Sequence, residues 1–233
     1  MNSTSKLGRT GIVVASRFDS SRLPGKAMFN FAGHSLIGFV LSRLKTSLLS
    51  DVLILATSDQ VIDDVVASEA KKYGVKVYRG SLNDVLGRYS GAAREFQLDT
   101  VIRLTGDNPF VNGEYVDNFS KQIVGVTDTI YTTRPLCPRG LNVQILSADM
   151  LFWLDKKNDL SHAHREHVTS WFYTNKSPWN PVEFSLPNGW KEIETSFSID
   201  TIDDYKKAVK FIDSVDYTNF STEDFVDGIM SQK

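Results

Sequence analysis

The first half of the chain alternates apolar runs of strand length with amphipathic stretches of helix length. The apolar runs lie at about 10–16, 51–57, 75–78 and 100–104. The amphipathic stretches between them lie at about 35–45, 60–73 and 83–96. Apolar strands are typical of parallel sheets covered on both faces, and short strand-to-helix connections favour right-handed crossovers. The alternation therefore predicts an α/β fold with a mostly parallel sheet.

Polar residues mark where each of these helices is expected to begin. Ser35 is the expected cap of the first helix. The pair Ser58-Asp59 ends the second strand and is expected to cap the second helix, which closes at Gly74. Asn83 or Ser81 is the expected cap of the third helix.

The regular alternation of predicted strands and helices ends after Pro109. We expect helices at about 113–124, 147–156, 162–174, 203–215 and 221–231, and strands at about 128–133, 141–146, 182–185 and 196–199. The run 141–146 alternates like a half-exposed strand, and 134–140 reads as a stiff loop. No internal repeat is visible, so we predict one domain over 1–233 in which 134–190 is an elaboration.

Composition excludes several classes of function. The chain is 41% apolar and 23% charged, which is usual for a globular protein. A net charge of −2 provides no basic field to attract nucleic acid or an anionic membrane. The single cysteine, Cys137, excludes an internal disulfide and fits a reducing compartment. No run approaches the roughly 18 apolar residues of a membrane span. We therefore expect a cytoplasmic protein.

The stretch Arg17–Lys26 places three cations and two serines just past the first predicted strand. Arginine offers planar, bidentate donors and lysine a compact point charge, so such a loop can wrap a polyphosphate. Leu23-Pro24 stiffens the loop and disfavours a helix. The alternative is an ordinary solvated loop. The carboxyl ends of parallel strands are where ligands bind, and this loop, Arg79-Gly80 and Gly106-Asp107 all follow strands.

Two aspartates follow predicted strands. Asp107 lies in Thr105-Gly106-Asp107-Asn108-Pro109, where Gly106 permits close backbone approach, and Asp200 follows the strand 196–199. Two carboxylates at neighbouring strand ends suit Mg²⁺, which takes oxygen ligands and completes its shell with water and substrate phosphates. The alternatives are a turn residue for Asp107 and a helix cap for Asp200.

The motif Arg17-x-x-Ser20-x-Arg22-Leu23-Pro24-x-Lys26 resembles the N-terminal signature of the cytidylyltransferases that make CMP-activated sugars, most closely the spore coat polysaccharide type. The segments 78–89, 138–143 and 165–169 are similar to that type as well. The resemblance covers roughly 10–211. It implies a three-layer α/β/α, Rossmann-like nucleotidyltransferase sheet (GT-A-like), a loop that holds the triphosphate of CTP, and a homodimer that pairs through 134–190.

The resemblance also implies roles for individual residues. The expected nucleotide-binding residues are Ala15, Ser16, Arg17, Ser20, Arg22, Lys26, Ser58, Arg79, Gly80, Ser81, Asp84, Thr105 and Gly106. Asp107 and Asp200 match the family's two metal-binding aspartates. The segment 78–89 borders the nucleotide in that family. Arg88 can pair with Asp84 one turn away and only brace the loop, or the backbone near Gly80 can instead contact the edge of the cytosine base.

The expected acceptor-binding residues are Arg139, Asn142, Arg165 and His167. For His167 the alternative is a satisfied polar residue on a helix. His162 and His164 match no zinc-binding spacing. The chain departs from the family pattern at Asp19, where glycine is common, and this puts a negative charge near the phosphates unless the side chain points away.

Together with the cationic loop and the two aspartates, this resemblance predicts an enzyme, a Mg²⁺-dependent cytidylyltransferase. CMP would pass from CTP to an acidic sugar of the nonulosonate or octulosonate kind and pyrophosphate would leave, with Arg17, Arg22, Lys26 and Asp107 as catalytic residues. A phosphorylated or phosphonate acceptor, a different nucleotide, and a non-catalytic nucleotide-binding protein are the alternatives. The glycine-rich loop usual in relatives that use UTP or dTTP is missing, which argues against a different nucleotide.

Overall fold

The computed structural model describes residues 7–123, 130–133, 137–179, 181–187, 189–215 and 220–230. Parts of four sequence predictions lie outside these residues. The predicted strand 128–133 and the predicted helices 113–124 and 221–231 each have one end outside the described residues. The predicted loop 134–140 has residues 134–136 outside them.

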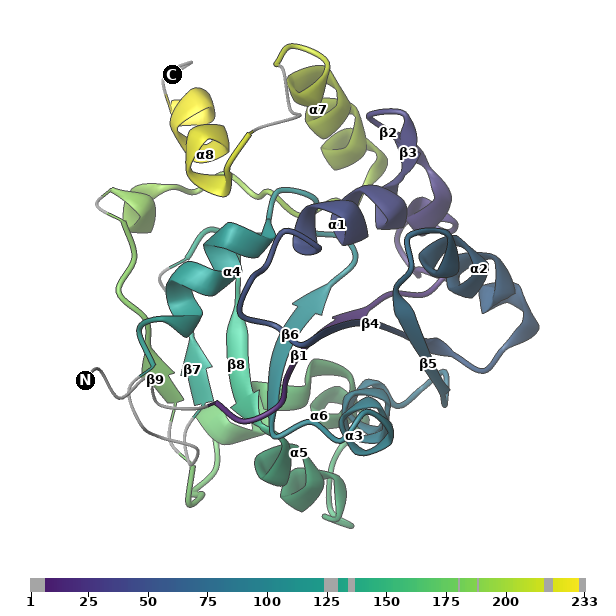
Figure 1. Ribbon diagram of the computed structural model, residues 1–233, viewed down its shortest axis with the longest axis vertical. Coiled ribbons are helices and arrows are strands. Elements are labelled where there is room, and N and C mark those ends of the chain that lie inside the picture. Colours follow the sequence, from purple (N-terminus) through teal and green to yellow (C-terminus); the bar gives the residue numbers. More distant parts are fainter. Residues whose placement is uncertain are drawn as a thin grey trace.

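Seven of the described strands form one sheet in the order β5-β4-β1-β6-β8-β7-β9 (Figure 1). Their bounds are β1 Thr10–Ala15, β4 Val52–Ser58, β5 Lys76–Gly80, β6 Thr100–Thr105, β7 Ile130–Thr132, β8 Gln144–Ser147 and β9 Pro181–Glu183. Strands β5, β4, β1 and β6 are parallel. β8 is antiparallel to both β6 and β7, and β9 is parallel to β7. The mostly parallel sheet is therefore confirmed.

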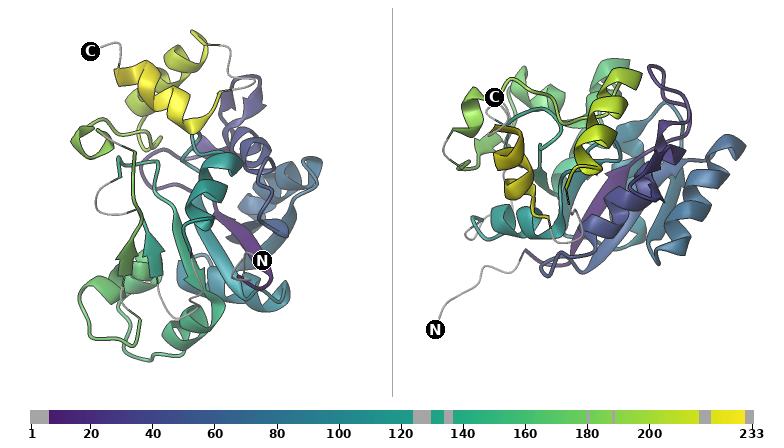
Figure 2. Two further views of the ribbon diagram at one scale, coloured as in Figure 1. Left: turned by 60° about the vertical axis from the view of Figure 1, so that its left-hand side comes forward. Right: turned by 90° about the horizontal axis from the view of Figure 1, so that it is seen from above.

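Helices cover both faces of the sheet (Figures 1 and 2). Their bounds are α1 Leu36–Leu44, α2 Asp64–Lys72, α3 Val85–Glu95, α4 Gly113–Ser120, α5 Ala148–Asp155, α6 His162–His167, α7 Ile202–Ile212 and α8 Thr222–Met230. Side chains alternate across a strand, so Ile12 and Val14 pack with α1, α2 and α4, while Val13 packs with α3 and α5. The predicted three-layer architecture follows from these two apolar faces.

Short elements fill the connections. The strands β2 (Asn30–Phe31) and β3 (His34–Ser35) form a hairpin before α1, and 3-10 helices cover Lys26–Met28, Val61–Asp63, Val168–Tyr173 and Trp190–Glu192. Among the described residues, no helix combines the length and the apolar character that crossing a membrane requires.

The helix caps differ in part from the prediction. Ser35 caps α1, since its side chain accepts the amide N–H of Gly38. The cap of α3 is Asp84, not Asn83 or Ser81, because the Asp84 carboxylate accepts the amide N–H of Gly87. The prediction that Ser58 and Asp59 cap α2 is wrong, because a 3-10 helix comes first and Ser58 instead donates to the buried carboxylate of Asp63.

Three elements of the second half also differ. The predicted helix 162–174 divides into α6 and a 3-10 helix because Val168 has a φ of +51°. Strand β8 is buried rather than half-exposed, since β6 and β7 flank it. The segment 196–199 is not a strand. Two isolated backbone hydrogen bonds hold it, from Phe197 to Arg139 and from Ile199 to Asp107.

Candidate active site

The loop that follows β1 lies directly against the loop that follows β6. The amide N–H of Gly106 donates to the carbonyl of Ala15 at 2.9 Å. A Cβ on Gly106 would lie only 2.7 Å from the Cβ of Ser16, so a larger residue there would force the two loops apart. The predicted close approach at Gly106 is confirmed, and it brings the cationic loop to the carboxyl end of β6.

Backbone contacts bring Asp200 to the same place. The amide N–H of Ile199 donates to the carbonyl of Asp107 at 2.9 Å, and that of Phe197 donates to the carbonyl of Arg139 at 2.7 Å. Gly140 has a φ of +94° and lies so close to this segment that a Cβ would meet its backbone at 2.3 Å. Two aspartates 93 positions apart therefore lie together at the end of the sheet.

The ammonium of Lys26 lies between the two carboxylates. Its Nζ is 2.9 Å from Asp107 Oδ2, 3.4 Å from Asp200 Oδ1 and 2.7 Å from the carbonyl oxygen of Ile199. The Lys26 side chain is only 13% exposed. Three oxygen atoms that converge on one cation form the arrangement that a hard metal ion also prefers.

Asp200 has further partners. Its Oδ1 accepts from Arg22 Nη2 at 2.6 Å, and its Oδ2 accepts from Arg139 Nη2 and from the hydroxyl of Ser198. The Asp200 side chain is 6% exposed. The cap of α7 is Thr201, so the alternative in which Asp200 serves as a helix cap does not hold.

A hollow of about 270 Å³ opens beside this cluster. It is lined by Ala15, Ser16, Arg17, Ser20, Ser21, Arg22, Lys26, Ala27, Val85, Arg88, Arg103, Thr105, Gly106, Asp107, Glu166, His167 and Asp200. Most of the predicted loop residues are among them. Asp19 is exposed and is not part of this lining, so its charge does not face the hollow.

A second hollow of about 560 Å³ adjoins the first. It is lined by Arg22, Arg103, Leu104, Thr105, Asp107, Asn108, Cys137, Arg139, Gly140, Asn142, Gln144, His167, Ser198 and Asp200. Six residues are common to both hollows: Arg22, Arg103, Thr105, Asp107, His167 and Asp200. Two ligands, one in each hollow, would therefore meet at the two aspartates.

Positive charge predominates in this double hollow. The residues that line the two hollows include six lysine and arginine side chains but only three carboxylates, those of Asp107, Glu166 and Asp200. An excess of local cations suits polyanionic ligands, although the chain as a whole carries a net charge of −2.

Several predicted site residues line neither hollow: Ser58, Arg79, Gly80, Ser81, Asp84 and Arg165. The guanidinium of Arg79 donates to the carbonyl oxygens of Ser58 and Gln60 and pairs with Asp64. Arg165 pairs with Asp84 at 2.6 Å and with Asp155 at 2.7 Å. The hydrogen bond with Asp84 is the main cause that raises the pKa of Arg165. These contacts brace the elements around the site.

Arg88 braces the loop that precedes α3. Its Nη1 donates to the carbonyl oxygens of Ser81 and Leu82 at 2.6 and 2.9 Å, and burial lowers its pKa. The expected pair with Asp84 does not form, because Asp84 accepts from Gly87 and from Arg165 instead. Leu82 also accepts from Arg17 at 3.4 Å, so this loop and the loop after β1 share a contact.

The sequence reasoning missed several polar residues of the double hollow, among them Arg103, Gln144 and Glu166. For Arg103 a signal was present, since it is a charged residue inside an apolar strand of the central sheet. Such a residue needs a polar partner or a ligand. Glu166 gave no comparable signal, because its position depends on how α6 packs against α3.

The residues fit a magnesium ion. Among the described residues no group of three or more His, Cys, Asp or Glu side chains forms a closed metal cage. Mg²⁺ does not need one, because one or two carboxylates plus substrate phosphates and water usually suffice. Asp107 and Asp200 already converge on the Lys26 ammonium, so their oxygen atoms are arranged around a cation.

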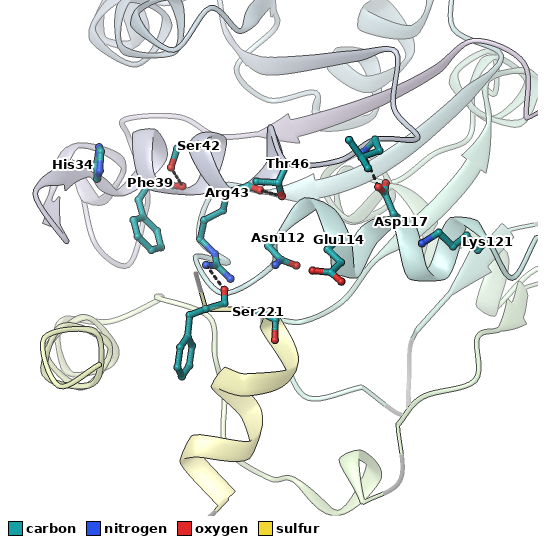
Figure 3. A pocket seen from close by; sticks show the side chains of 12 residues that line it. His34, Phe39, Ser42, Arg43, Thr46, Asn112, Glu114, Asp117, Lys121 and Ser221 are labelled. Atoms are coloured by element: carbon teal, nitrogen blue, oxygen red, sulfur yellow. Dashed lines mark hydrogen bonds between the residues drawn. The ribbon is translucent and has the colours of Figure 1, made fainter. Parts of the chain in front are cut away.

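A third hollow of about 580 Å³ lies between α1, α4 and the start of α8 (Figure 3). Its polar groups make structural contacts. Arg43 donates to the carbonyl oxygens of Phe220 and Phe110, and burial lowers its pKa to about 10. Asp117 accepts from Ser47 and from the amide N–H of Leu48. These contacts tie α1 to α4 and α8.

Comparison with known proteins gives consistent matches. A family model described as cytidylyltransferase matches residues 11–224. A cytidylyltransferase structure from Leptospira borgpetersenii has a TM-score of 0.87 and 30% identity, and the match covers 96% of this chain and 94% of that chain. The spore coat polysaccharide biosynthesis protein SpsF of Bacillus subtilis is 28% identical, over 83% of this chain and 82% of its own length. A 3-deoxy-manno-octulosonate cytidylyltransferase from Anaeromyxobacter sp. is 29% identical, over 57% of this chain and 54% of its own length.

Proposed function

Because the chain belongs to the cytidylyltransferase family, we propose that it transfers CMP from CTP to a hydroxyl group of an acidic sugar. The acceptor oxygen attacks the α-phosphorus of CTP and forms a new phosphorus–oxygen bond. The bond between the α-phosphorus and the bridging oxygen breaks, pyrophosphate leaves, and the hydroxyl proton is released. The product is a CMP-sugar of the nonulosonate or octulosonate type, for a surface polysaccharide or glycoconjugate.

The first hollow is the proposed CTP site. Arg17, Arg22 and Lys26 line it from one loop, and they would bind the β- and γ-phosphates and stabilise the charge that develops on pyrophosphate. Arg22 and Lys26 contact the two aspartates in the structure, so they would exchange carboxylate oxygens for phosphate oxygens when CTP binds. Positioning and charge neutralisation account for most of the catalysis in such a site.

Asp107 and Asp200 are the proposed ligands of a magnesium ion. When bound, Mg²⁺ supplies neutralisation of phosphate charge and lowers the pKa of the attacking hydroxyl. Thr105 positions the carboxylate of Asp107, because its hydroxyl donates to Asp107 Oδ1 at 2.6 Å. Ser198 does the same for Asp200.

The second hollow is the proposed acceptor site. Arg139, Asn142 and His167 line it, as the proposed acceptor-binding role requires, whereas Arg165 is held by two carboxylates outside it. The observation that carries the proposal is that two adjoining hollows share Asp107 and Asp200. An acceptor in one and a nucleotide in the other would place their reacting atoms at the carboxylates.

The test is pyrophosphate release by the purified protein. We expect release with Mg²⁺, CTP and one of a panel of sugar acids that includes 3-deoxy-manno-octulosonate and N-acetylneuraminate, and no release with UTP or after chelation. Asp107→Asn should lower kcat by about 100-fold or more, because it removes a carboxylate from the proposed metal site. Asp149→Asn, on α5 and absent from both linings, serves as the matched control.

CTP binding without pyrophosphate release for any sugar acid would overturn the proposed acceptor class. A phosphorylated or phosphonate acceptor would then be tested in the same assay. Absence of CTP binding itself would overturn the nucleotide assignment.

We also propose that the protein acts in the cytoplasm as a homodimer. Strand β9 lies within 134–190 at the edge of the sheet, and Val182 on it is 44% exposed, so a second copy could pack along this edge. Light scattering at micromolar concentration should give twice the mass of the chain. A monomer under those conditions would contradict the proposal.

A further inference from the structure

A cation in the middle of the sheet lacks a counter-charge. Arg103 projects from β6, between Val13 on β1 and Gln144 on β8. Its Nη1 donates to Gln144 Oε1 at 2.8 Å, and its guanidinium lies 5.3 Å from the centre of the Tyr89 ring. Within the described part of the chain, no carboxylate pairs with Arg103, and its buried Nε has no hydrogen-bond partner.

The other cation common to both hollows differs in this respect. Arg22 pairs with Asp200 at 2.6 Å, whereas the polar and aromatic partners of Arg103 among the described residues are an amide oxygen and a tyrosine ring. A partly buried guanidinium that has lost water without gaining an anion is electrostatically costly. Its planar fork matches a carboxylate or a phosphate. Arg103 would therefore stabilise an anionic group of a bound ligand.

The surroundings hold Arg103 in place. Gln144 is 2% exposed, and its side-chain amide donates to the hydroxyl of the buried Thr169 at 3.0 Å. Tyr89 is fully buried and donates to the carbonyl oxygen of Leu104 at 2.6 Å. A cation fixed in this way binds its ligand without paying much side-chain entropy.

A second unsatisfied group belongs to the same hollow. Asn142 lines the second hollow, and its Oδ1 is a buried acceptor with no donor among the described residues. A ligand that carries both an anionic group and hydroxyl groups would satisfy Arg103 and Asn142 together. A sugar acid has this combination of groups, whereas a neutral sugar lacks the anion.

We propose that Arg103 binds the carboxylate of the acceptor and so selects sugar acids over neutral sugars. This inference rests on the proposed function and names a specificity residue for it. Arg103 lines both hollows, and its hydrogen bond to Gln144 holds it next to β8, beside the second hollow. Arg17 and Lys26, which would hold the triphosphate, line only the first hollow. The competing role, binding of the α-phosphate of CTP, is one outcome of the test.

The experiment compares Arg103→Met and Arg103→Lys with the wild type. The acceptors are the sugar acid that the wild type uses best and the primary amide of that acid. Arg103→Met should raise the KM for the acid about 10- to 100-fold and abolish the preference for acid over amide. The affinity for CTP, measured by calorimetry, should change less than about twofold. Arg103→Lys keeps the charge and should retain part of the preference.

Arg94→Met is the matched control. Arg94 also lies over an aromatic ring, 4.0 Å from the centre of Phe152, but on α3 and outside both hollows. It should leave both KM values unchanged. If Arg103→Met does not fold, as judged by urea unfolding, Arg103→Lys supplies the same comparison.

Two results would overturn the inference while the proposed function stands. One is turnover by Arg103→Met with an unchanged KM for the acid. The other is an equal loss of affinity for CTP and for CMP, which would assign Arg103 to the α-phosphate. If the wild type binds CTP but releases no pyrophosphate with any sugar acid, the proposed acceptor class fails, and this inference fails with it.

Discussion

At the residue scale, Lys26 occupies the place between Asp107 and Asp200 where the proposed metal would bind. Its ammonium lies within hydrogen-bonding distance of Asp107, Asp200 and the carbonyl oxygen of Ile199. Lys26→Met should therefore tighten Mn²⁺ binding in the absence of nucleotide by about 10-fold, because the two carboxylates lose a neighbouring positive charge. The same variant should weaken CTP binding. Paramagnetic titration of free Mn²⁺ and calorimetry with CTP measure the two effects.

Lys45→Met is the control, since the ammonium of the exposed Lys45 donates to the carbonyl oxygen of Tyr73 and lines neither hollow. It should change neither affinity. Equal Mn²⁺ affinity for Lys26→Met and the wild type would show that the ammonium and the metal do not share the carboxylates.

The single cysteine should be chemically inert. Burial raises the pKa of Cys137 to about 11. The thiol therefore stays protonated at neutral pH, and the reactive thiolate appears only as the pH approaches 11. We expect iodoacetamide to react at pH 8 about 100-fold more slowly with the native protein than with the urea-unfolded protein. Alkylation of the native protein at the rate of a free thiol would contradict this.

The sequence predicts residues of this site well where the backbone alone places them. Lys26 and Asp107 follow the predicted strands that form β1 and β6, and the carboxyl ends of these parallel strands lie at one edge of the sheet. Asp200 was expected to follow a strand that does not form, and a single backbone hydrogen bond from Ile199 to Asp107 brings it to the site instead. Arg165 and Arg103 show the limit. Arg165 lies on the short helix α6, and the packing of that helix turns its side chain toward Asp84 and away from the site. Arg103 belongs to β6, a strand for which the sequence pattern predicts a buried structural role and no ligand contact.

At the scale of elements, Asp63 joins the cationic loop to the end of β4. It is fully buried, its Oδ1 accepts the amide N–H of Phe18 at 2.5 Å, and its Oδ2 accepts the N–H and the hydroxyl of Ser58. In Asp63→Asn, the side-chain amide N–H₂ would point toward the N–H and hydroxyl groups of Phe18 and Ser58, which need an acceptor. The substitution should cost about 2 kcal/mol of unfolding free energy and weaken CTP binding. Urea unfolding and calorimetry measure the two changes.

The neighbouring Asp64 provides a close control. Its side chain is 57% exposed and pairs only with Arg79 in the described residues. Asp64→Asn should change the unfolding free energy by less than about 0.5 kcal/mol. If the two variants are equally stable and bind CTP equally well, Asp63 does not position the loop.

Regular elements were predictable because their causes are local. Apolar runs gave β1, β4 and β6, and Ser35 gave the start of α1. The break at Val168 and the non-strand segment 196–199 were not predictable, because tertiary contacts decide both. The segment has strand-like residues, but its partners are single backbone groups of Arg139 and Asp107 rather than a strand.

At the scale of the whole molecule, α8 supports the segment that carries Asp200. Phe225 is 2% exposed and stacks on Phe110 with the ring centres 3.6 Å apart. It also meets the ring of Phe197 edge-on, at 5.3 Å. Phe225→Ala should cost about 3–5 kcal/mol of unfolding free energy, because it leaves a cavity inside an aromatic cluster. Urea unfolding measures the cost.

A second effect distinguishes support of the site from simple loss of stability. Phe225→Ala should also weaken Mn²⁺ binding at temperatures where the variant is fully folded, because Phe197 lies three residues before Asp200. Ile202→Ala removes an exposed apolar side chain near the same aspartate and should change neither property appreciably. Unchanged Mn²⁺ affinity in folded Phe225→Ala would limit α8 to a structural role.

The direction of β8 has a consequence for how such a protein diversifies. Because β8 is antiparallel to β6, the first residue of β8, Gln144, pairs with Arg103 near the C-terminal end of β6. The proposed triphosphate contacts come from the N-terminal loop, whereas two of the proposed acceptor contacts, Arg139 and Asn142, come from the segment that enters β8. Insertions or substitutions in the segment that enters β8 can change the shape of the second hollow without shifting the register of β1 and β6. Changes confined to that segment would thus alter the proposed acceptor site and leave the proposed triphosphate loop as it is.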